Sequence, residues 1–352
     1  MRIAVDAMGG DHAPQAIVEG AMIAARDLTD IHIVLVGDES KIRSYMDDSC
    51  PPNIEIVHTT EVIESDEKEP VKAVRRKKNA SMVIALEMVR EGKADAVISA
   101  GNTGAFMSGG VFITKRIDGI ERPALAPILP SLEQGKGTLV LDVGANIDAK
   151  PEHLLQYAMM GNIYAQGVMG VPTPRVGLLN IGAEELKGNE LMRETFGLLN
   201  NSNLHFIGNI EARDVPFGAC DVLICDGFSG NILLKSLEGM AGAVFQVLKD
   251  ELTSSIISKA GAALLKPSLR RIKKKMDYTE YGGAPLMGLQ GTCIKAHGSS
   301  NANAIKHAIF QAAQFVEKDI IGLIQKEVQQ ERRELDAENE SSGNPGDGSL
   351  FA

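Results

Sequence analysis

The sequence predicts an α/β protein built on a mostly parallel β-sheet with helices on both faces. Short apolar runs alternate along the chain with longer amphipathic segments, which is the pattern of consecutive strand–helix–strand units. Several of these runs end in Gly, Asn or Asp, as expected where a strand enters a loop. We therefore expect one doubly wound α/β domain over residues 1–335, with its ligands at the carboxyl ends of the strands.

The expected strands are short runs rich in Val, Ile and Leu. They are Ile3–Asp6, Ile31–Val36, Ile54–Val57, Ala96–Ser99, Leu139–Val143, Val176–Asn180, Leu204–Ile207 and Val222–Cys225. The expected helices lie between them and are Gln15–Ala25, Ser81–Glu91, Thr103–Lys115, Pro151–Val168 and Asn189–Leu199. Pro14 and Pro151 stand at helix starts, where the first turn tolerates a residue without an N–H group.

The alternation of strands and helices stops in two places. From residue 228 to residue 275 the pattern is helical and basic, which predicts a helical pair or hairpin that projects from the sheet. A last helix is expected from about residue 301 to 334. The polar, glycine-containing stretch 336–352 has the composition of a disordered tail.

Composition and charge exclude several classes of protein. The formal net charge of −10 disfavours nucleic acid as a partner, because phosphate contacts need clustered Lys and Arg. No apolar run approaches the roughly 20 residues of a membrane-spanning helix, and the N-terminus does not resemble a signal peptide. The 4 cysteines lack zinc-ligand spacing, so we expect buried, reduced thiols in a cytoplasmic protein. Every charged residue from Lys259 to Lys275 is nevertheless basic.

Loops rich in Gly, Asn, Ser and Thr follow several of the expected strands. They are AMGGDH after residue 6, AGNTGA after residue 99, GAN after residue 143, DGFSGN after residue 225, and KAHGSSN near the C-terminus. Glycine lets the backbone approach a ligand, and helix N-termini offer unpaired N–H groups. Such loops suit phosphate, or a thioester carbonyl whose oxygen gains charge during attack. Tight strand–helix connections use the same residues, so no single loop establishes a site.

Other well-known sites are not supported. The sequence has no GxGxxG followed by an acidic residue about 20 positions later, no GxxxxGK[ST] and no GxSxG. His12 and His297 lie in glycine turns without metal-ligand spacing, so we expect neither a metal nor an organic cofactor. Lys187 stands between an expected strand and an expected helix, a position that also suits an ordinary surface lysine.

A series of motifs resembles the phosphate acyltransferases of phospholipid synthesis, the PlsX family. In family order they are VDAMGGDHAP, EPVKAVRRKKNASM, SAGNTGA, LDVGAN, KPEHLLQYAMMG, LNIGAEELKGNE, NIEARD, CDGFSGN, YGGAPLMGL and KAHGSSN, within residues 1–334. The resemblance implies a homodimer with a three-layer α/β/α sandwich, like isocitrate and isopropylmalate dehydrogenases and phosphotransacetylases. It also implies transfer of a long-chain acyl group from acyl carrier protein to inorganic phosphate. A membrane glycerol-3-phosphate acyltransferase would then use the acyl phosphate for phospholipid synthesis.

The resemblance also implies which residues act. The family's proposed catalytic residues fall on Lys187 in KGNE and Asn231 in GFSGN. Lys187 would hold phosphate as a point charge, and Asn231 would donate to the thioester oxygen as it becomes an oxyanion. The residues expected to complete the phosphate and thioester site are Gly9, Gly10, Asp11, His12, Asn102, Thr103, Gly104, Asn146, Gly230, His297 and Ser299.

The basic helical segment has two candidate uses. Its relevant residues are Ile256, Ile257, Lys259, Leu264, Lys266, Arg270 and Arg271. One use is peripheral binding to an anionic membrane, with apolar residues inserted and lysines on the headgroups. The other is docking of acyl carrier protein, which is small and acidic. Arg75–Lys78 is a competing site for the carrier protein, and packing of the apolar stripe in the core is a third interpretation.

Three other functions stay open at this point. A phosphotransacetylase-like enzyme using acyl-CoA would share the fold. A metal-dependent dehydrogenase would need clustered aspartates, for which Asp6, Asp142 and Asp226 at strand ends give slight support. A non-catalytic scaffold at the membrane would depend on the basic helix alone and would leave the glycine-rich loops without a purpose.

Overall fold

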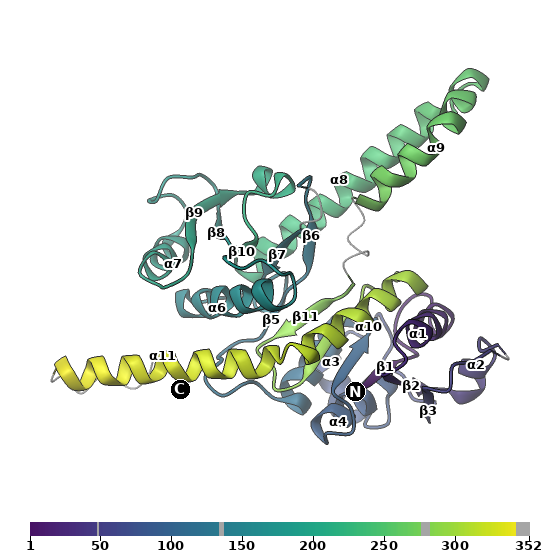
Figure 1. Ribbon diagram of the computed structural model, residues 1–352, viewed down its shortest axis with the longest axis horizontal. Coiled ribbons are helices and arrows are strands. Elements are labelled where there is room, and N and C mark those ends of the chain that lie inside the picture. Colours follow the sequence, from purple (N-terminus) through teal and green to yellow (C-terminus); the bar gives the residue numbers. More distant parts are fainter. Residues whose placement is uncertain (48, 134–136, 276–281, 343–352) are drawn as a thin grey trace.

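Two mostly parallel sheets form the framework of the protein (Figure 1). The computed structural model describes residues 1–47, 49–133, 137–275 and 282–342. The first sheet has 7 strands in the order β3-β2-β1-β4-β12-β11-β5, and β11 runs antiparallel to both of its neighbours. These strands are β1 (Arg2–Asp6), β2 (His32–Gly37), β3 (Ile54–His58), β4 (Ala96–Ser99), β5 (Ala124–Leu125), β11 (Ala284–Met287) and β12 (Thr292–Lys295).

The second sheet has 5 strands in the order β6-β7-β10-β8-β9. β6 pairs antiparallel with β7, and the other pairs are parallel. Its strands are β6 (Ile128–Pro130), β7 (Gly137–Leu141), β8 (Val176–Asn180), β9 (Phe206–Glu211) and β10 (Val222–Ile224).

Helices cover both faces of the first sheet because its central strands are apolar on both sides. In β1, Ile3 and Val5 belong to one buried cluster and Ala4, between them, belongs to another. Successive residues of a strand point to opposite faces, so such a run is stable only between two helical layers. The covering helices are α1 (Gln15–Asp27) and α10 (Ala302–Glu317) on one face, and α3 (Pro70–Arg76), α4 (Ser81–Arg90) and α5 (Thr103–Gly109) on the other.

The second sheet is covered on one face by α6 (Pro151–Gly167) and α7 (Glu190–Asn200). The buried rings of Tyr157 and Tyr164 on α6 fill this layer. On the other face, Val140 and Leu223 join the same buried cluster as Val97 of the first sheet. One hydrophobic core therefore continues from one sheet to the other.

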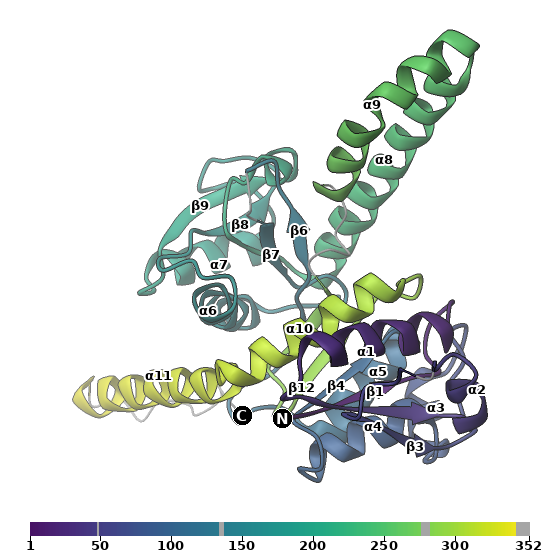
Figure 2. The same ribbon diagram turned by 45° about the vertical axis from the view of Figure 1, so that its right-hand side comes forward.

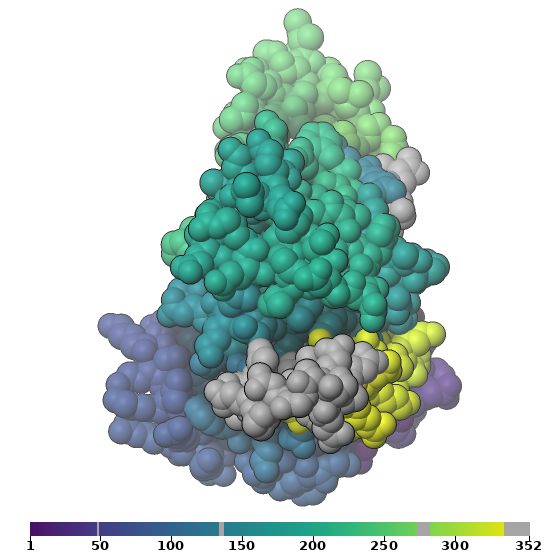
Figure 3. Space-filling view, turned by 90° about the vertical axis from the view of Figure 1, so that its left-hand side faces the viewer, coloured from purple at the N-terminus to yellow at the C-terminus, as the bar shows by residue number. Residues whose placement is uncertain are grey.

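The segment 124–130 joins the two sheets by giving an edge strand to each, β5 and β6. Between these strands the Ala126 N–H donates to the Pro285 carbonyl of the first sheet, at 3.0 Å. The Val140 N–H of the second sheet donates to the Pro127 carbonyl, also at 3.0 Å. We call the two units, each a sheet with its helices, the first and second lobes. Figure 3 shows the second lobe (teal) above the first (purple to blue).

A long helical pair projects from the two lobes (Figures 1 and 2). It consists of α8 (Gly227–Thr253) and α9 (Ile256–Lys275), which pack against each other.

Helix α11 (Ile320–Ser342) passes beside α6. Within the described ranges, no helix combines the length and hydropathy needed to span a membrane. The remaining short elements are α2 (Glu39–Arg43), η1 (Gly110–Thr114) and η2 (Ala212–Phe217).

The α/β fold class with mostly parallel strands is confirmed, and several details differ from expectation. The strands divide between two sheets. The strand expected at Leu204–Ile207 is β9 at Phe206–Glu211, displaced toward the C-terminus. The helix expected from about 301 to 334 is interrupted at Asp319, whose positive φ of 47° ends α10 before α11 begins. Helix α11 continues to Ser342, so the expected tail 336–352 is helical in its first part, and residues 343–352 lie outside the described residues.

The cysteines agree with expectation except for Cys50. Cys220, Cys225 and Cys293 are buried free thiols, whereas Cys50 is exposed in the loop before β3. Burial raises the pKa of Cys220 and Cys293 to about 12 and that of Cys225 well above its ordinary value. These three thiols stay protonated at neutral pH, so none of them is suited to act as a thiolate nucleophile.

Candidate active site

Three glycine-rich loops of the first lobe meet at the carboxyl ends of β1, β4 and β12. The Asp11 N–H donates to the Gly298 carbonyl at 2.8 Å. A Cβ at Gly10 would lie 3.0 Å from both the Cβ of Ala100 and the carbonyl oxygen of Gly298, and Gly10 has a φ of +108°. Glycine is therefore required here by close packing as well as by backbone conformation. The strand order of the first sheet changes direction between β1 and β4. Ligands of doubly wound sheets bind at such a point, beyond the carboxyl ends of the strands.

The buried side chain of Asp6 stabilises the conformation of these loops. It is 2% exposed, and its two carboxylate oxygens accept the hydroxyls of Ser81 and Ser99, at 2.6 Å each. Burial raises the pKa of Asp6 despite these bonds. A Cβ at Gly9 would lie 2.5 Å from an oxygen of Asp6 and 2.6 Å from the Gly101 nitrogen. The carboxylate is thus enclosed by the loops that it orders.

Asp142 has the same place in the second lobe, directly after β7. Its carboxylate accepts the backbone N–H groups of Leu125 at 2.9 Å, Ala145 at 3.0 Å and Asn146 at 2.6 Å. Burial raises the pKa of Asp142, and these bonds oppose the shift. The first turn of α8 lies directly on it, since a Cβ at Gly230 would be 1.9 Å from the Asp142 carbonyl oxygen. Asp142 therefore fixes the first turn of α8 at Gly230, one residue before Asn231.

A cavity of about 220 Å³ lies between the lobes and contains Asn231. Both lobes contribute to its walls, the first through Thr103 and the segment from Lys295 to Gly298, and the second through Val143 and α8. We call it the Asn231 cavity. Its lining residues are Thr103, Leu125, Pro127, Ile128, Val143, Asn231, Leu234, Lys235, Glu238, Gly282, Gly283, Ala284, Lys295, Ala296, His297 and Gly298. Its polar side chains are one amide, one hydroxyl, one imidazole, one carboxylate and two ammonium groups.

The most buried charged group of this cavity is Lys295, the last residue of β12. It is 7% exposed, and its Nζ donates to the carbonyl of Ala296. Burial lowers the pKa of Lys295 to about 8, although Asp6 and Asp11 act in the opposite direction. Lys295 begins the expected loop KAHGSSN, but no role was predicted for it because β12 was not predicted. The available signal was the run Thr292–Lys295, with two β-branched residues ahead of a glycine turn.

His297 faces the cavity as a hydrogen-bonding group. Its Nδ1 lies 2.8 Å from the Ser299 hydroxyl and accepts the Ser299 N–H at 3.2 Å. Because Nδ1 accepts this bond, the proton of the neutral ring lies on Nε2. Burial is the main cause that lowers the pKa of His297, with Glu238 opposing it. A neutral donor is therefore favoured at neutral pH.

Lys187 lies in the loop between β8 and α7, and β8 is the neighbour of β10 in the second sheet. Its side chain is 50% exposed, and its Nζ lies 3.9 Å from a carboxylate oxygen of Glu184. Lys187 and Asn231 thus follow the carboxyl ends of adjacent parallel strands. Lys187 does not line the Asn231 cavity.

The other expected site residues divide between the cavity wall and its support. Thr103 and His297 line the Asn231 cavity. The Asn102 side chain instead caps α5 by accepting the Ala105 N–H at 2.9 Å, and its amide donates to the Ser65 carbonyl. The Asn146 amide donates to the Pro123 carbonyl at 2.6 Å and to the Tyr157 hydroxyl at 2.9 Å.

The glycine positions and the remaining polar residues lie behind or beside the cavity wall. A Cβ at Gly104 would come within 3.0 Å of the Pro70 side chain, so this glycine allows α5 to approach α3. Asp11, His12 and Ser299 are exposed, and Ser299 reaches the cavity only through its bonds to His297.

A second cavity has a volume of about 590 Å³. It is lined near the Asn231 cavity in sequence, since Pro123 stands two residues before Leu125 and Ala145 two residues after Val143. Its lining residues are Val71, Met107, Ser108, Val111, Phe112, Arg116, Glu121, Arg122, Pro123, Ala145, Asn146, Leu286 and Leu289. We call it the Phe112 cavity. Its wall combines apolar side chains with two arginines, a glutamate and two neutral polar residues, and its volume is in the range of small-molecule sites.

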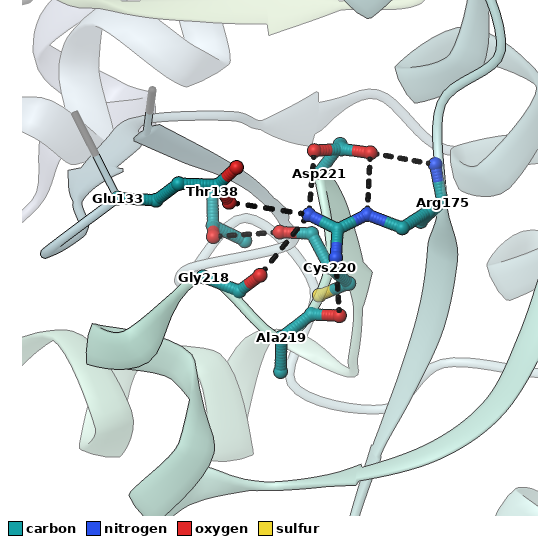
Figure 4. Close-up of polar contacts among 7 residues, drawn as sticks. All are labelled: Glu133, Thr138, Arg175, Gly218, Ala219, Cys220 and Asp221. Carbon is teal, nitrogen blue, oxygen red and sulfur yellow. Dashed lines mark hydrogen bonds and ion pairs between the residues drawn. The ribbon is translucent and has the colours of Figure 1, made fainter. Parts of the chain in front are cut away.

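A polar cluster lies at the opposite end of the second sheet (Figure 4). None of the residues labelled there lines the Asn231 cavity or the Phe112 cavity. Arg175 precedes β8 and makes a bidentate pair with Asp221, with Nε and Nη2 each 3.0 Å from a carboxylate oxygen. It also donates to the Gly218 and Ala219 carbonyls. Asp221 is 5% exposed, so the cluster fixes the amino ends of β8 and β10.

Comparisons with known proteins agree with this architecture. A family model described as "Fatty acid synthesis protein" matches residues 1–323. Proteins named phosphate acyltransferase from Brevibacillus brevis and Geobacillus thermodenitrificans are each 59% identical to this chain over 329 residues. The alignments cover 94% of this chain and 98% and 99% of those proteins, respectively.

Solved structures share the fold at low sequence identity. The EutD phosphotransacetylase from Staphylococcus aureus has a TM-score of 0.57 at 16% identity, covering 90% of this chain and 94% of that one. A phosphotransacetylase from Streptococcus pyogenes has a TM-score of 0.56 at 17% identity, with the same coverage. At these identities the likeness shows the fold alone.

An α/β fold of this kind, together with relatives at 59% identity, defines the protein as an acyltransferase. The chain belongs to the fatty acid synthesis protein family, and the resemblance to phosphate acyltransferases inferred from its motifs is confirmed.

Proposed function

We propose that this acyltransferase moves a long-chain acyl group from acyl carrier protein to inorganic phosphate, in the Asn231 cavity. The acyl phosphate would serve a membrane glycerol-3-phosphate acyltransferase in phospholipid synthesis. The observation that carries the proposal is a small cavity that joins an amide donor with buried and exposed ammonium groups, together with a second, larger cavity whose wall is partly apolar. A small anion and a long acyl chain need two separate spaces of this kind.

The reaction needs positioning and charge stabilisation more than a strong base. An oxygen of hydrogen phosphate attacks the thioester carbonyl carbon, forming a C–O bond. The C–S bond then breaks, and the phosphate proton passes to the departing thiolate, giving acyl phosphate and the free carrier thiol. Asn231 donates to the carbonyl oxygen as its charge grows, and Lys187, half-exposed in the loop that follows the neighbouring strand, would add positive charge beside the reacting thioester. The site residues named here require neither a metal nor an organic cofactor for these roles.

The Phe112 cavity supports a long acyl donor and favours one docking site for its carrier. Arg75 on α3 stacks over the ring of Phe112, with its guanidinium carbon 4.7 Å from the ring centre. Arg75, Arg76 and Lys78 are exposed, and Val71 of the same helix lines the cavity. An acidic carrier bound to this cluster would deliver its acyl arm directly into this cavity. We therefore place the carrier protein at Arg75–Lys78.

For the projecting helix α9 we propose the other candidate use, which is contact with an anionic membrane. Ile256, Ile257 and Leu264 are 86%, 85% and 85% exposed. Lys259 and Lys266 are exposed beside them, with Arg270 and Arg271 further along the helix. A helix with bare apolar side chains and adjacent cations is suited to the interface of anionic lipids. Peripheral binding at this surface would bring acyl phosphate to the membrane enzyme that consumes it.

A homodimer is proposed through α8. Met240, Val244 and Val247 recur at helical spacing and are 66%, 54% and 63% exposed, although α9 packs on the same helix. Analytical ultracentrifugation of the wild type and of Val244→Asp tests this. A wild-type dimer that becomes monomeric in the variant supports the interface, and a monomeric wild type contradicts it.

The proposed activity is tested directly by mixing the enzyme with a long-chain acyl carrier protein and inorganic phosphate. Acyl phosphate is trapped with hydroxylamine as the hydroxamate, while release of the carrier thiol is followed separately. We expect thiol release that depends on phosphate and matches hydroxamate formation. Acetyl-CoA in place of the acyl carrier protein distinguishes a phosphotransacetylase. Faster turnover with acetyl-CoA, or thiol release without phosphate, would contradict the proposal.

A further inference from the structure

Lys295 is an ammonium group that the fold buries at the wall of the Asn231 cavity. An ammonium group has three N–H donors, and one of them is used by the Ala296 carbonyl. Within the part of the chain that the structure describes, Lys295 forms no ion pair. Burying a cation without a paired anion is costly, since the protein interior replaces the water that would stabilise it.

Two carboxylates attract Lys295 from a distance, without an ion pair to it among the described residues. Asp6 acts from the interior, where its two oxygens accept serine hydroxyls. Asp11 is exposed on the loop after β1, with a carboxylate oxygen 3.4 Å from the Cβ position of Gly298 in the cavity wall. Across the cavity, Glu238 of α8 pairs with Lys235 at 2.7 Å. The remaining titratable neighbour is His297, whose pKa is lowered by burial and which therefore favours the neutral form.

The free space beside Lys295 is small, and polar groups form part of its wall. A volume of about 220 Å³ is sufficient for a tetrahedral oxyanion. Neutral donors face the same space, namely the Thr103 hydroxyl at the start of α5 and the Asn231 amide. One buried cation with several neutral donors is the donor set that suits a small, doubly charged anion.

We propose that Lys295 is the main phosphate-binding cation of this enzyme, contacting the inorganic phosphate in the cavity that it shares with Asn231. The identity of the anion rests on the proposed function. Bound phosphate supplies the missing counter-charge, and Lys295 in turn lowers the repulsion between the phosphate and the oxyanion that forms beside it. Lys187 is then left to act on the exposed side of the reacting thioester.

The first test uses Lys295→Met, which keeps most of the length of the side chain and removes its charge. We expect the melting temperature without phosphate to stay the same or rise, because a buried cation is removed. The KM for phosphate should increase about tenfold or more, with the KM for the acyl donor within about twofold, and phosphate should no longer raise the melting temperature. The matched control is Lys306→Met on α10, where Lys306 pairs with Asp27 at 2.7 Å, away from the cavity.

Two results of this test would overturn the inference. One is an unchanged KM for phosphate. The other is a variant that is less stable without phosphate and yet keeps the phosphate-induced rise in melting temperature, since Lys295 would then be structural.

The second test needs no variant and decides the question if Lys295→Met does not fold. The wild-type enzyme is carbamylated with cyanate, a small reagent, and labelling of each lysine is measured by mass spectrometry with and without inorganic phosphate. Phosphate should protect Lys295 several-fold and leave Lys306 unaffected; equal labelling of Lys295 in both samples contradicts the inference. Formation of acyl phosphate by an enzyme whose Lys295 is unprotected would refute this inference alone. Protection of Lys295 without any acyl phosphate would refute the proposed function alone.

Discussion

The carbonyl oxygen of Asp142 occupies the space that a Cβ at Gly230 would need, with only 1.9 Å between the two positions. The obstacle is backbone, which cannot rotate away as the end of a side chain can. Gly230 was expected to contact phosphate or the thioester, and the structure gives it a packing reason as well. It allows α8 to begin directly on β7 and so sets the position of Asn231.

Gly230→Ala should therefore displace the start of α8 and lower kcat by about 100-fold, because a shift near 1 Å in a catalytic group is that costly. The melting temperature should also fall. Gly239→Ala is the matched control on the same helix, since a Cβ at Gly239 meets nothing within 4 Å. That control should gain about 1 kcal/mol of stability and keep its activity. Full activity of Gly230→Ala would show that the position of Asn231 does not depend on this contact.

Asn231→Ala and Lys187→Ala should each lower kcat by about 100-fold, the typical effect of losing one donor to an oxyanion. Both residues are exposed, so the unfolding free energy should hardly change. Steady-state hydroxamate formation measures the first effect and urea denaturation the second. Asn201→Ala, at the exposed end of α7, is the control and should behave as the wild type. Turnover within a few-fold of the wild type in either site variant would remove that residue from the mechanism.

Arg175→Met should destabilise the protein by about 3 kcal/mol, because it removes the guanidinium that pairs with the buried Asp221 carboxylate. The residues of this cluster (Figure 4) lie at the amino ends of the strands and line neither cavity, so the folded enzyme should keep its kcat and KM. Urea denaturation measures the loss. Arg213→Met breaks an exposed pair with Glu211 and should cost less than about 1 kcal/mol. Equal losses in the two variants would mean that burial of Asp221 is unimportant.

The pKa of Lys295 predicts a pH-dependent stability. Its value of about 8 in the folded protein lies below the 10.5 of an ordinary lysine. Below about pH 8 the group is charged in both the folded and unfolded states, and the folded state carries the cost. As the pH rises from 8 to 10.5 the folded state loses its proton first and the cost disappears.

In phosphate-free buffer, Lys295→Met should accordingly be the more stable protein at pH 7, by an amount on the order of 3 kcal/mol. This advantage should shrink steadily as the pH approaches 10. Urea denaturation of both proteins at several pH values measures it. A stability difference that is independent of pH would show that Lys295 titrates normally.

Ile257→Ser and Leu264→Ser should each weaken sedimentation with anionic phospholipid vesicles several-fold, because both side chains are 85% exposed on α9. Catalysis on soluble substrates should not change. Leu132→Ser is the control, since Leu132 is also exposed, at 64%, but lies in the second lobe. Binding that survives both α9 variants and is abolished by salt would indicate charge attraction without insertion.

The alternation of apolar runs was sufficient to predict the fold class and most strands of both sheets. It could not predict which strands pair, because the period of a strand records burial and not its neighbours. The short strands β5 and β6 have only 2 and 3 residues, and β11 contains Pro285, so neither length nor composition marks them. Because these edge strands cannot be recognised in the sequence, the sequence predicts a single sheet, whereas the structure has two.

The candidate site could likewise be predicted only in part from the sequence. Gly-rich turns after strands predicted where the loops gather, and motif resemblance supplied Lys187 and Asn231. Lys295 could not be found this way, because its importance comes from its burial, and burial of a lysine is a property of the fold. Asn146 looked like a free donor in sequence, whereas its amide is bonded to Pro123 and Tyr157.

The walls of the Asn231 cavity belong to both lobes, which the chain connects through the short segment 124–130. Any molecule that fills the cavity touches both and acts as a removable cross-link. Occupancy should then stabilise both lobes together, in addition to the hydrophobic core that they already share. A substrate that is bound and released in every catalytic cycle therefore also forms and removes a contact between the lobes.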